Sequence, residues 1–261
     1  MIEIAVVLVL VGLLLGSFIG SLTQRIETSQ REKTQKQLLD IRTALLGFAS
    51  AEGRLPCPTS TTASGLEAPV GGSTMANPCA LQHGFVPGKT LGIDGAYNRD
   101  NLLIDVWGNP FRYSVTTADN NAFTTLFTVP GAGGMRDVTM QGLDPDLVIC
   151  DRDSTAADIC AGGANTLIDN APFVVLSLGK DGSAFVTATA PDSDQGENAG
   201  ELVVAANAAG ENIAYTVGSG NAFVKRAYSS DGTAAGQFDD MIIWVSPYEI
   251  YARMMEAGQL P

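Results

Sequence analysis

The chain has 261 residues and a formal charge of −13, from 15 basic and 28 acidic side chains. A nucleic-acid-binding surface needs clustered Lys and Arg for its phosphate contacts, so this balance argues against a direct nucleic-acid partner. The single histidine, His83, excludes multi-histidine metal sites such as HExxH. Apolar residues make up 45% of the chain and charged residues 16%, which argues against general disorder.

The negative charge is confined to one part of the chain. Residues 1–52 hold five basic and five acidic residues, so the whole excess of acid lies in residues 53–261. The second part is long enough to bury a substantial core. We therefore divide the chain into an N-terminal segment, residues 1–52, and a globular domain, residues 53–261.

An uncharged apolar run opens the chain. Residues 4–22 carry no charge, and such a run is long enough to cross the hydrocarbon of a bilayer as a helix. No basic residue precedes Arg25, which argues against a cleavable signal peptide. Glu3 stands at the start of the run, where a carboxylate is costly in lipid unless it is paired, so we interpret it as functional. The alternative is a Glu3 that is merely hydrated at the headgroup level.

Glycines and apolar residues divide the N-terminal segment into two halves. Gly12, Gly16 and Gly20 are spaced by four, and small residues at this spacing let membrane helices approach closely. Within residues 28–51 the apolar residues recur at helical spacing: Leu38, Ile41, Leu45 and Phe48. Gly53 and Pro56 end the pattern. The sequence predicts one helix over residues 2–52, about 75 Å long, with a lipid-facing first half and an amphipathic second half.

The segment from Ile2 to Gly12 resembles the N-terminal methylation and assembly segment of type IV pilins and type II secretion pseudopilins. In that family the Glu pairs with the N-terminal amine of a neighbouring subunit, and the apolar helices bundle into a filament core. The resemblance implies this role for Glu3. Family precursors carry a short basic leader that a prepilin peptidase removes, whereas here only Met1 precedes Ile2. We therefore expect either that the first residue of the chain has been assigned too late or that the chain is trimmed. Gly20 stands where many members have a helix-bending Pro.

Four cysteines follow the apolar run: Cys57, Cys79, Cys150 and Cys160. They form no CxxC motif, and with one histidine a zinc site is not expected. Three pairings are possible, and we favour 57–79 and 150–160 because these close local polar loops. An even number of cysteines on loops indicates an oxidising compartment such as the periplasm. The alternative is four free thiols in a cytosolic protein.

Residues 53–261 predict an α+β fold. The first part, residues 53–100, is rich in Gly, Pro, Ser and Thr and is expected to be a long irregular connection. Seven strand-like runs follow, at 102–106, 111–115, 123–129, 173–178, 185–189, 202–205 and 241–245. No helical pattern separates them, which favours an antiparallel sheet. We expect the long helix to pack on this sheet, with long loops around it.

A short C-terminal helix is predicted from its start and stop signals. Ser246 is placed at the N-cap, Pro247 at the first helical position, and Glu249 in the first turn. The apolar face is expected to comprise Ile250, Met254 and Met255, and Gly258 to end the helix.

Three further segments are similar to the major pseudopilin of type II secretion. Residues 105–113 resemble its Asp-Pro-Trp-Gly-Asn-Pro-aromatic turn, residues 177–182 its Ser-Leu-Gly-x-Asp-Gly loop, and residues 239–244 its Asp-Asp-Ile/Val-x-x-Trp segment. In that family the loop helps to bind calcium, an ion that prefers six to eight oxygen ligands. The resemblance implies a calcium site; its candidate ligands are Asp181, Asp239, Asp240 and the carbonyls near Leu178. The alternative is a hairpin turn at 181–182 and two acids that cap a strand.

The other polar motifs favour no chemistry. The acidic clusters at 151–153 and 192–197 lack EF-hand spacing and are expected to be solvated loops. His83 is expected to lie on the surface or in a turn. No G-x-S-x-G motif is present, and residues 131–134 lack the Lys and Ser/Thr of a phosphate loop. We therefore expect no enzyme, and no cofactor apart from calcium.

The resemblance implies a structural subunit of a type II secretion pseudopilus or a type IV pilus-like filament. Its partners would be further copies of itself, other pilin-like subunits, the inner-membrane assembly platform and the prepilin peptidase. We expect a single-pass protein of the bacterial inner membrane, with residues 53–261 in the periplasm or on an extracellular filament. Two alternatives remain open: a minor type IV pilin with an adhesive or DNA-uptake role, and a membrane-anchored periplasmic enzyme or binding domain that does not assemble.

Overall fold

The structure is a computed structural model that describes residues 2–69, 79–125, 133–138, 140–152, 159–160, 164–183, 193–230 and 236–260. Within residues 2–23 it describes the backbone, and the side chains of Ile4 and Val11 only. The predicted strand at 185–189 and the second part of the one at 123–129 lie outside the described residues.

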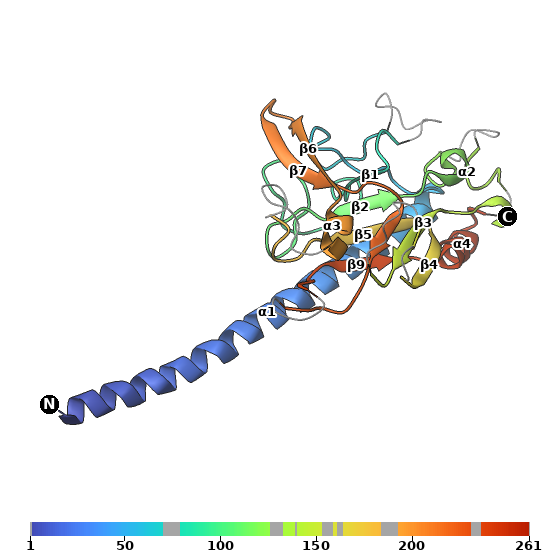
Figure 1. Ribbon diagram of the computed structural model, residues 1–261. Coiled ribbons are helices and arrows are strands. Elements are labelled where there is room, and N and C mark those ends of the chain that lie inside the picture. The colour runs from blue at the N-terminus through green and yellow to red at the C-terminus, as the bar shows by residue number, and fades with distance from the viewer. Residues whose placement is uncertain are drawn as a thin grey trace.

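Helix α1 (Ile2–Glu52) confirms the predicted continuous helix. Its first half extends away from the rest of the molecule, and its second half packs against the body (Figure 1). Leu38, Ile41 and Leu45 are fully buried, as their spacing predicts. The helix ends at Gly53, whose φ of 72° lies in the left-handed region and whose N–H donates to the carbonyl of Ala49 at 2.9 Å.

The sequence predicts that the first half of this helix crosses a membrane. Among the residues whose side chains are described, no helix is both long enough and apolar enough to cross a membrane. Glu3, Gly12, Gly16 and Gly20 all lie in α1, and beyond this backbone assignment their surroundings are outside the described part of the chain.

The central sheet has the strand order β1-β2-β5-β9, with every neighbouring pair antiparallel. Its strands are β1 (His83–Phe85), β2 (Arg112–Val115), β5 (Phe173–Ser177) and β9 (Met241–Trp244). Tyr113, Val175 and Ile243 lie in register across three strands and belong to the core that contains α1. The predicted strands at 111–115, 173–178 and 241–245 are confirmed.

A second sheet covers the other face of the central one. Its strand order is β4-β3-β8, formed by β3 (Leu147–Cys150), β4 (Thr166–Ala171) and β8 (Ala222–Val224). Ile149 and Phe223 pack with Leu176 and Ile242 of the central sheet in a second core. Strands β3 and β8 pair in parallel, which corrects the expectation of antiparallel pairing throughout. Strand β5, Phe-Val-Val-Leu-Ser, is a nearly continuous apolar run because both of its faces are buried.

Two other expectations about strands were wrong. Residues 102–106 form only isolated bridges, because the Asp105 carboxylate accepts hydrogen bonds from the backbone N–H groups of Trp107 and Asn109, both at 2.9 Å, and so closes a turn. The described part of 123–129, residues 123–125, is a turn and bend. Within the expected irregular stretch 53–100, His83–Phe85 forms β1.

A two-stranded hairpin projects from the body. It pairs β6 (Glu201–Ala206), which confirms the prediction at 202–205, with β7 (Asn212–Val217) (Figure 1). Leu202 and Val204 on one face are 55% and 64% exposed, whereas Tyr215 of β7 packs its ring against that of Phe85, with centroids 5.3 Å apart.

The short helices complete the fold. They are α2 (Ala118–Asn121), the 3-10 turn Met140–Gly142, α3 (Ser193–Ala199) and α4 (Pro247–Glu256). Helix α4 begins after Ser246 and has Pro247 at its start, as predicted, and Ile250 and Met254 are fully buried. Met255, placed on the apolar face by the sequence, is 43% exposed because the buried face uses Tyr251 instead.

Two disulfide bonds staple the loops. Cys57 is bonded to Cys79 and Cys150 to Cys160, so the favoured pairing is confirmed. The bonds close loops across sequence separations of 22 and 10 residues. Cross-links of this kind restrict the unfolded chain and stabilise the fold around them.

Candidate functional site

Three carboxylates meet at one end of the central sheet. Asp181 follows β5, and Asp239 and Asp240 precede β9. Because these strands pair antiparallel with Ser177 opposite Met241, the segment that leaves one and the segment that enters the other lie together. One oxygen of each carboxylate lies within 4.8 Å of the others.

A glycine makes room for this cluster. Gly179 has a φ of 68°, and a Cβ there would lie 2.5 Å from Cγ of Asp239. Both the backbone conformation and the close approach therefore require glycine. The next residue, Lys180, donates its backbone N–H to Oδ2 of Asp239 at 2.6 Å.

The turn that resembles the pseudopilin motif supports the same loop. Asn109 donates its side-chain amide to the carbonyl of Gly179 at 2.6 Å, and Ser177 donates its hydroxyl to Asp105 at 2.6 Å. Asp105 and Asn109 are both buried, so these bonds are protected from water. These hydrogen bonds join segments 105–113 and 177–182, and the joined segments support the turn that carries Asp181.

Helix α3 supplies the remaining polar partners, and the sequence reasoning missed it. Gln195, fully buried, donates its side-chain amide to Oδ1 of Asp239 at 2.7 Å. Asn198 donates to Oδ2 of Asp240 at 2.8 Å. The expectation that 192–197 is a solvated loop is wrong for its described residues. No sequence signal could have found this helix, because Ser193–Ala199 has no apolar periodicity and contains Gly196.

The other acidic cluster, at 151–153, agrees better with the expectation of a solvated loop in its described residues. The Asp151 carboxylate accepts hydrogen bonds from Asn165, at 2.8 Å from the backbone N–H, and from the neighbouring Arg152. Asp153 lies outside the described residues.

Burial and mutual repulsion disfavour the charged form of these acids. Burial raises the pKa of Asp240 well above its usual value, and Asp239 and Asp181 raise it further. Burial, followed by the hydrogen bond and negative charge of Asp239, raises the pKa of Asp181 to about 7. The nearby Arg226 opposes this effect at Asp240, and it is itself paired with Asp194 at 2.6 Å.

The donor set fits a hard cation. Calcium lies 2.3–2.6 Å from its oxygen ligands, so ligands on opposite sides of one ion are about 5 Å apart, close to the 4.8 Å spread observed. Oδ1 of Asp240 and Oε1 of Gln195 are buried without a hydrogen-bond partner among the described residues. Turning the Gln195 amide would direct its oxygen at the carboxylates, since the two ends of an amide have the same shape.

The residues that would hold calcium are therefore Asp181, Asp239, Asp240 and Gln195. Leu178, whose neighbouring carbonyls the sequence suggested, buries its side chain in the second core at the start of the same turn. The positive charge of the bound ion would offset the negative charge of the clustered carboxylates.

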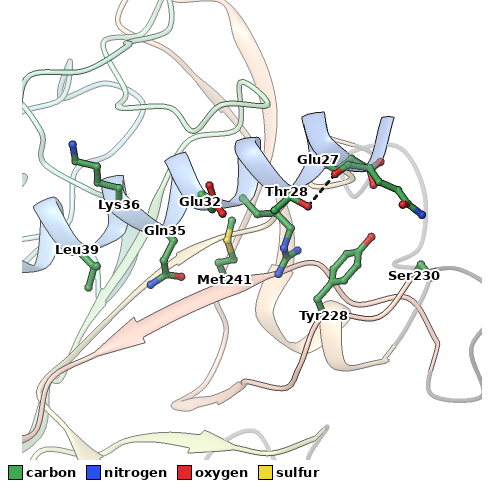
Figure 2. A pocket seen from close by; sticks show the side chains of 11 residues that line it. Glu27, Thr28, Glu32, Gln35, Lys36, Leu39, Tyr228, Ser230 and Met241 are labelled. Carbon is green, nitrogen blue, oxygen red and sulfur yellow. Dashed lines mark hydrogen bonds between the residues drawn. The ribbon is translucent and has the colours of Figure 1, made fainter. Parts of the chain in front are cut away.

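A groove runs beside this cluster along α1. It has a volume of about 870 Å³ and lies between the helix and Tyr228, Ser230 and Met241 (Figure 2). Arg31 spans it, with its guanidinium 4.2 Å from the ring centroid of Tyr228 and a 3.3 Å hydrogen bond from Nη1 to the carbonyl of Asp239. Lys180 Nζ lies 2.7 Å from Glu27 Oε1. The loop that carries the acids is therefore held to the helix by two side chains.

His83 is partly buried in a strand, which corrects the expectation of a surface or turn position. It lies in β1, and Nδ1 is 2.9 Å from the hydroxyl oxygen of Ser114 on β2. Ser114 is only 3% exposed and lies inside the central sheet, so the pair is a buried polar contact between strands. Burial lowers the pKa of His83 to about 4, against the opposing charge of Asp146.

This partly buried histidine gives a pH-dependent contribution to stability. In the unfolded chain His83 binds a proton below pH 6.5, whereas in the folded chain it stays neutral until about pH 4. Its contribution is therefore present above pH 6.5 and lost as the pH falls from 6.5 towards 4. Urea unfolding across this range should show a shallower pH slope for His83→Gln than for the wild type. Parallel slopes would show that His83 titrates alike in both states.

No family model, no curated protein and no solved structure matches the chain. The resemblance to pilin-like proteins therefore rests on the residues quoted above.

Proposed function

We propose that the chain is a structural subunit of a type II secretion pseudopilus or type IV pilus-like filament, which assembles through α1. The observation that supports this most is the unequal coverage of a 51-residue helix. Its second half lies in the core, whereas its first half extends from the body (Figure 1). Three described apolar side chains of that half, Ile4, Val11 and Ile26, are 68%, 44% and 57% exposed.

An exposed apolar half-helix needs a covering. Lipid would cover residues 4–22 before assembly, and the same segments of neighbouring subunits would cover them afterwards. Gly12, Gly16 and Gly20 would let these helices approach closely. Glu3 would be neutralised by the N-terminal amine of a neighbour, since an unpaired carboxylate is costly in apolar surroundings.

Calcium is the second part of the proposal. Bound between Asp181, Asp239 and Asp240, the ion would fix the segment before β9 against the turn after β5. Both segments contact α1, the turn after β5 through Lys180 and the segment before β9 through Arg31. The site would therefore stabilise the globular domain at the point where it meets the assembly helix.

The proposed location is the bacterial inner membrane, with residues 53–261 in the periplasm or on an extracellular filament. Both disulfides lie in this part of the chain, and such bonds persist in oxidising compartments. The proposed partners are further copies, other pilin-like subunits, the assembly platform and the prepilin peptidase on the precursor.

The test is the variant Glu3→Ala. It is expected to insert into the inner membrane like the wild type but to lose incorporation into filaments, measured by cross-linking and by recovery of sheared filaments. The matched control is Glu32→Ala, which removes an exposed carboxylate from the same helix. If Glu3→Ala assembled as efficiently as this control, the proposed role of Glu3 would be wrong; if the wild type itself entered no filament, the chain would be a membrane-anchored domain that does not assemble.

A further inference from the structure

A cavity of about 360 Å³ lies between the central sheet and the projecting hairpin, and its lining includes Leu178 and Gly182 of the turn that carries Asp181. Its lining includes Phe85 and Arg112 of the central sheet, residues 213–215 of β7, and Leu102 and Pro110. Its volume is in the range of small-ligand sites, and its lining is mainly apolar with a few polar groups.

Arg112 is the unusual residue of this cavity. It lies on β2, is 7% exposed, and stacks its guanidinium over the ring of Phe85 at 4.5 Å. Nη2 donates to the hydroxyl of Thr216 at 3.1 Å. Nε and Nη1 are buried and have no hydrogen-bond partner among the described residues. The side chain is thus a buried cation with most of its donors unused.

A buried cation without a counterion is unfavourable for the folded state. A buried charge normally has a counterion and satisfied hydrogen bonds, because its removal from water is costly. Burial lowers the pKa of Arg112 to about 9, so the guanidinium remains charged at neutral pH. An anion that entered the cavity would restore a charge partner in surroundings of low dielectric constant, where the attraction is strong.

The other groups in the cavity indicate which anion fits. Asp100 also lines it, with one carboxylate oxygen accepting a 2.8 Å hydrogen bond from Asn207. This carboxylate repels a doubly charged phosphate more than a singly charged group. Leu102, Ile213 and Tyr215 offer apolar contact beside the guanidinium. A carboxylate on a short apolar body satisfies both conditions.

We propose that the cavity at Arg112 binds a carboxylate carried on a short apolar body. Two sources share this chemistry, a free small carboxylic acid and the C-terminus of a peptide that ends in an aliphatic residue. The site does not depend on the proposed filament role, because it is formed within residues 53–261 alone.

Matched ligands test the charge requirement. The Tm of the full chain is measured in detergent micelles, at a fixed calcium concentration and ionic strength. It is measured in the presence of butyrate and in the presence of its neutral counterpart, butyramide. Butyrate is expected to raise the Tm in a saturable way and butyramide to leave it unchanged. The tripeptide Ala-Ala-Val, with a free or an amidated C-terminus, distinguishes the two sources. Equal shifts with butyrate and butyramide, a larger shift with inorganic phosphate, or no shift up to about 100 mM of any carboxylate would overturn the proposal.

Variants locate the site. Arg112→Met keeps the length of the side chain and removes the unpartnered charge, so it is expected to melt at or above the wild-type Tm and to lose the butyrate shift. Ile213→Trp is the second variant, because Ile213 lines the cavity on the same face of β7 as Tyr215, so a bulky ring there would reduce the cavity and keep Arg112. This variant is expected to raise the dissociation constant for butyrate at least tenfold. Arg253→Met, on the exposed face of α4, is the control. A butyrate shift that survives in both variants would contradict the assignment.

Discussion

Arg54→Ala is expected to lower the free energy of unfolding by about 3–5 kcal/mol, because it leaves a largely buried carboxylate without its partner. Arg54 and Glu67 form a bidentate pair with two N–O distances of 2.8 Å, and their side chains are only 5% and 12% exposed. Glu67 also accepts the backbone N–H of Cys57 at 3.2 Å. The pair thus ties the end of α1 to the disulfide-closed loop.

Two further variants separate this pair from a general loss of charge. Arg253→Ala removes an exposed partner of Glu256 at 3.8 Å, where solvent screens the attraction, and is expected to change the stability by less than about 0.5 kcal/mol. The double variant Arg54→Met with Glu67→Leu is expected to recover part of the loss, since it removes both buried charges. Urea unfolding of the full chain in detergent measures all three. An Arg54→Ala variant as stable as Arg253→Ala would mean that Glu67 finds water or another donor.

The parts of the fold that the sequence predicts are those that depend on local chemistry. Helix α1 follows from its apolar spacing and its glycine stop, and strands β2, β5 and β9 follow from apolar runs. The second sheet could not be predicted in the same way. Its strand β8 has three residues, and its parallel pairing with β3 joins segments that only the tertiary fold brings together.

The same distinction holds for the candidate site. Asp181, Asp239 and Asp240 were named from resemblance, and the antiparallel pairing of β5 with β9 places them within 4.8 Å. Gln195 was missed because its burial is a tertiary effect on a segment that is polar in sequence. Arg112 was placed in a strand, but the missing counterion at its guanidinium is a property of the folded surroundings.

Calcium is expected to raise the free energy of unfolding by about 4 kcal/mol when its concentration is a thousand times the dissociation constant. The ion would offset the repulsion among three clustered carboxylates, two of them only 5% exposed. Asp240→Asn removes one of these charges, so it is expected to be at least as stable as the wild type in chelator and to lose the calcium effect. Asp40→Asn, which changes an exposed acid on α1, is the control and should keep the effect.

The calcium effect is also expected to depend on pH, with a sign set by Asp181. Its pKa is raised from 3.8 in the unfolded chain to about 7 in the metal-free folded chain. Between these values the folded chain holds a proton that the unfolded chain has released. In chelator, the contribution of Asp181 to the stability therefore increases as the pH falls from 7 towards 4. Above pH 7 the carboxyl group is ionised in both the folded and the unfolded chain, and the folded chain bears the full cost of this buried charge.

Calcium binding reverses this dependence, because the ion needs the ionised carboxylates and competes with protons for them. The difference in Tm between calcium and chelator should be largest near about pH 8 and decrease as the pH falls through 7. Asp240→Asn should show no difference at any pH, which separates binding at the cluster from general screening of the acidic domain. His83 titrates alike in calcium and in chelator, so its effect cancels in the difference. A difference that stayed constant from about pH 8 to about pH 5 would place any bound calcium away from Asp181.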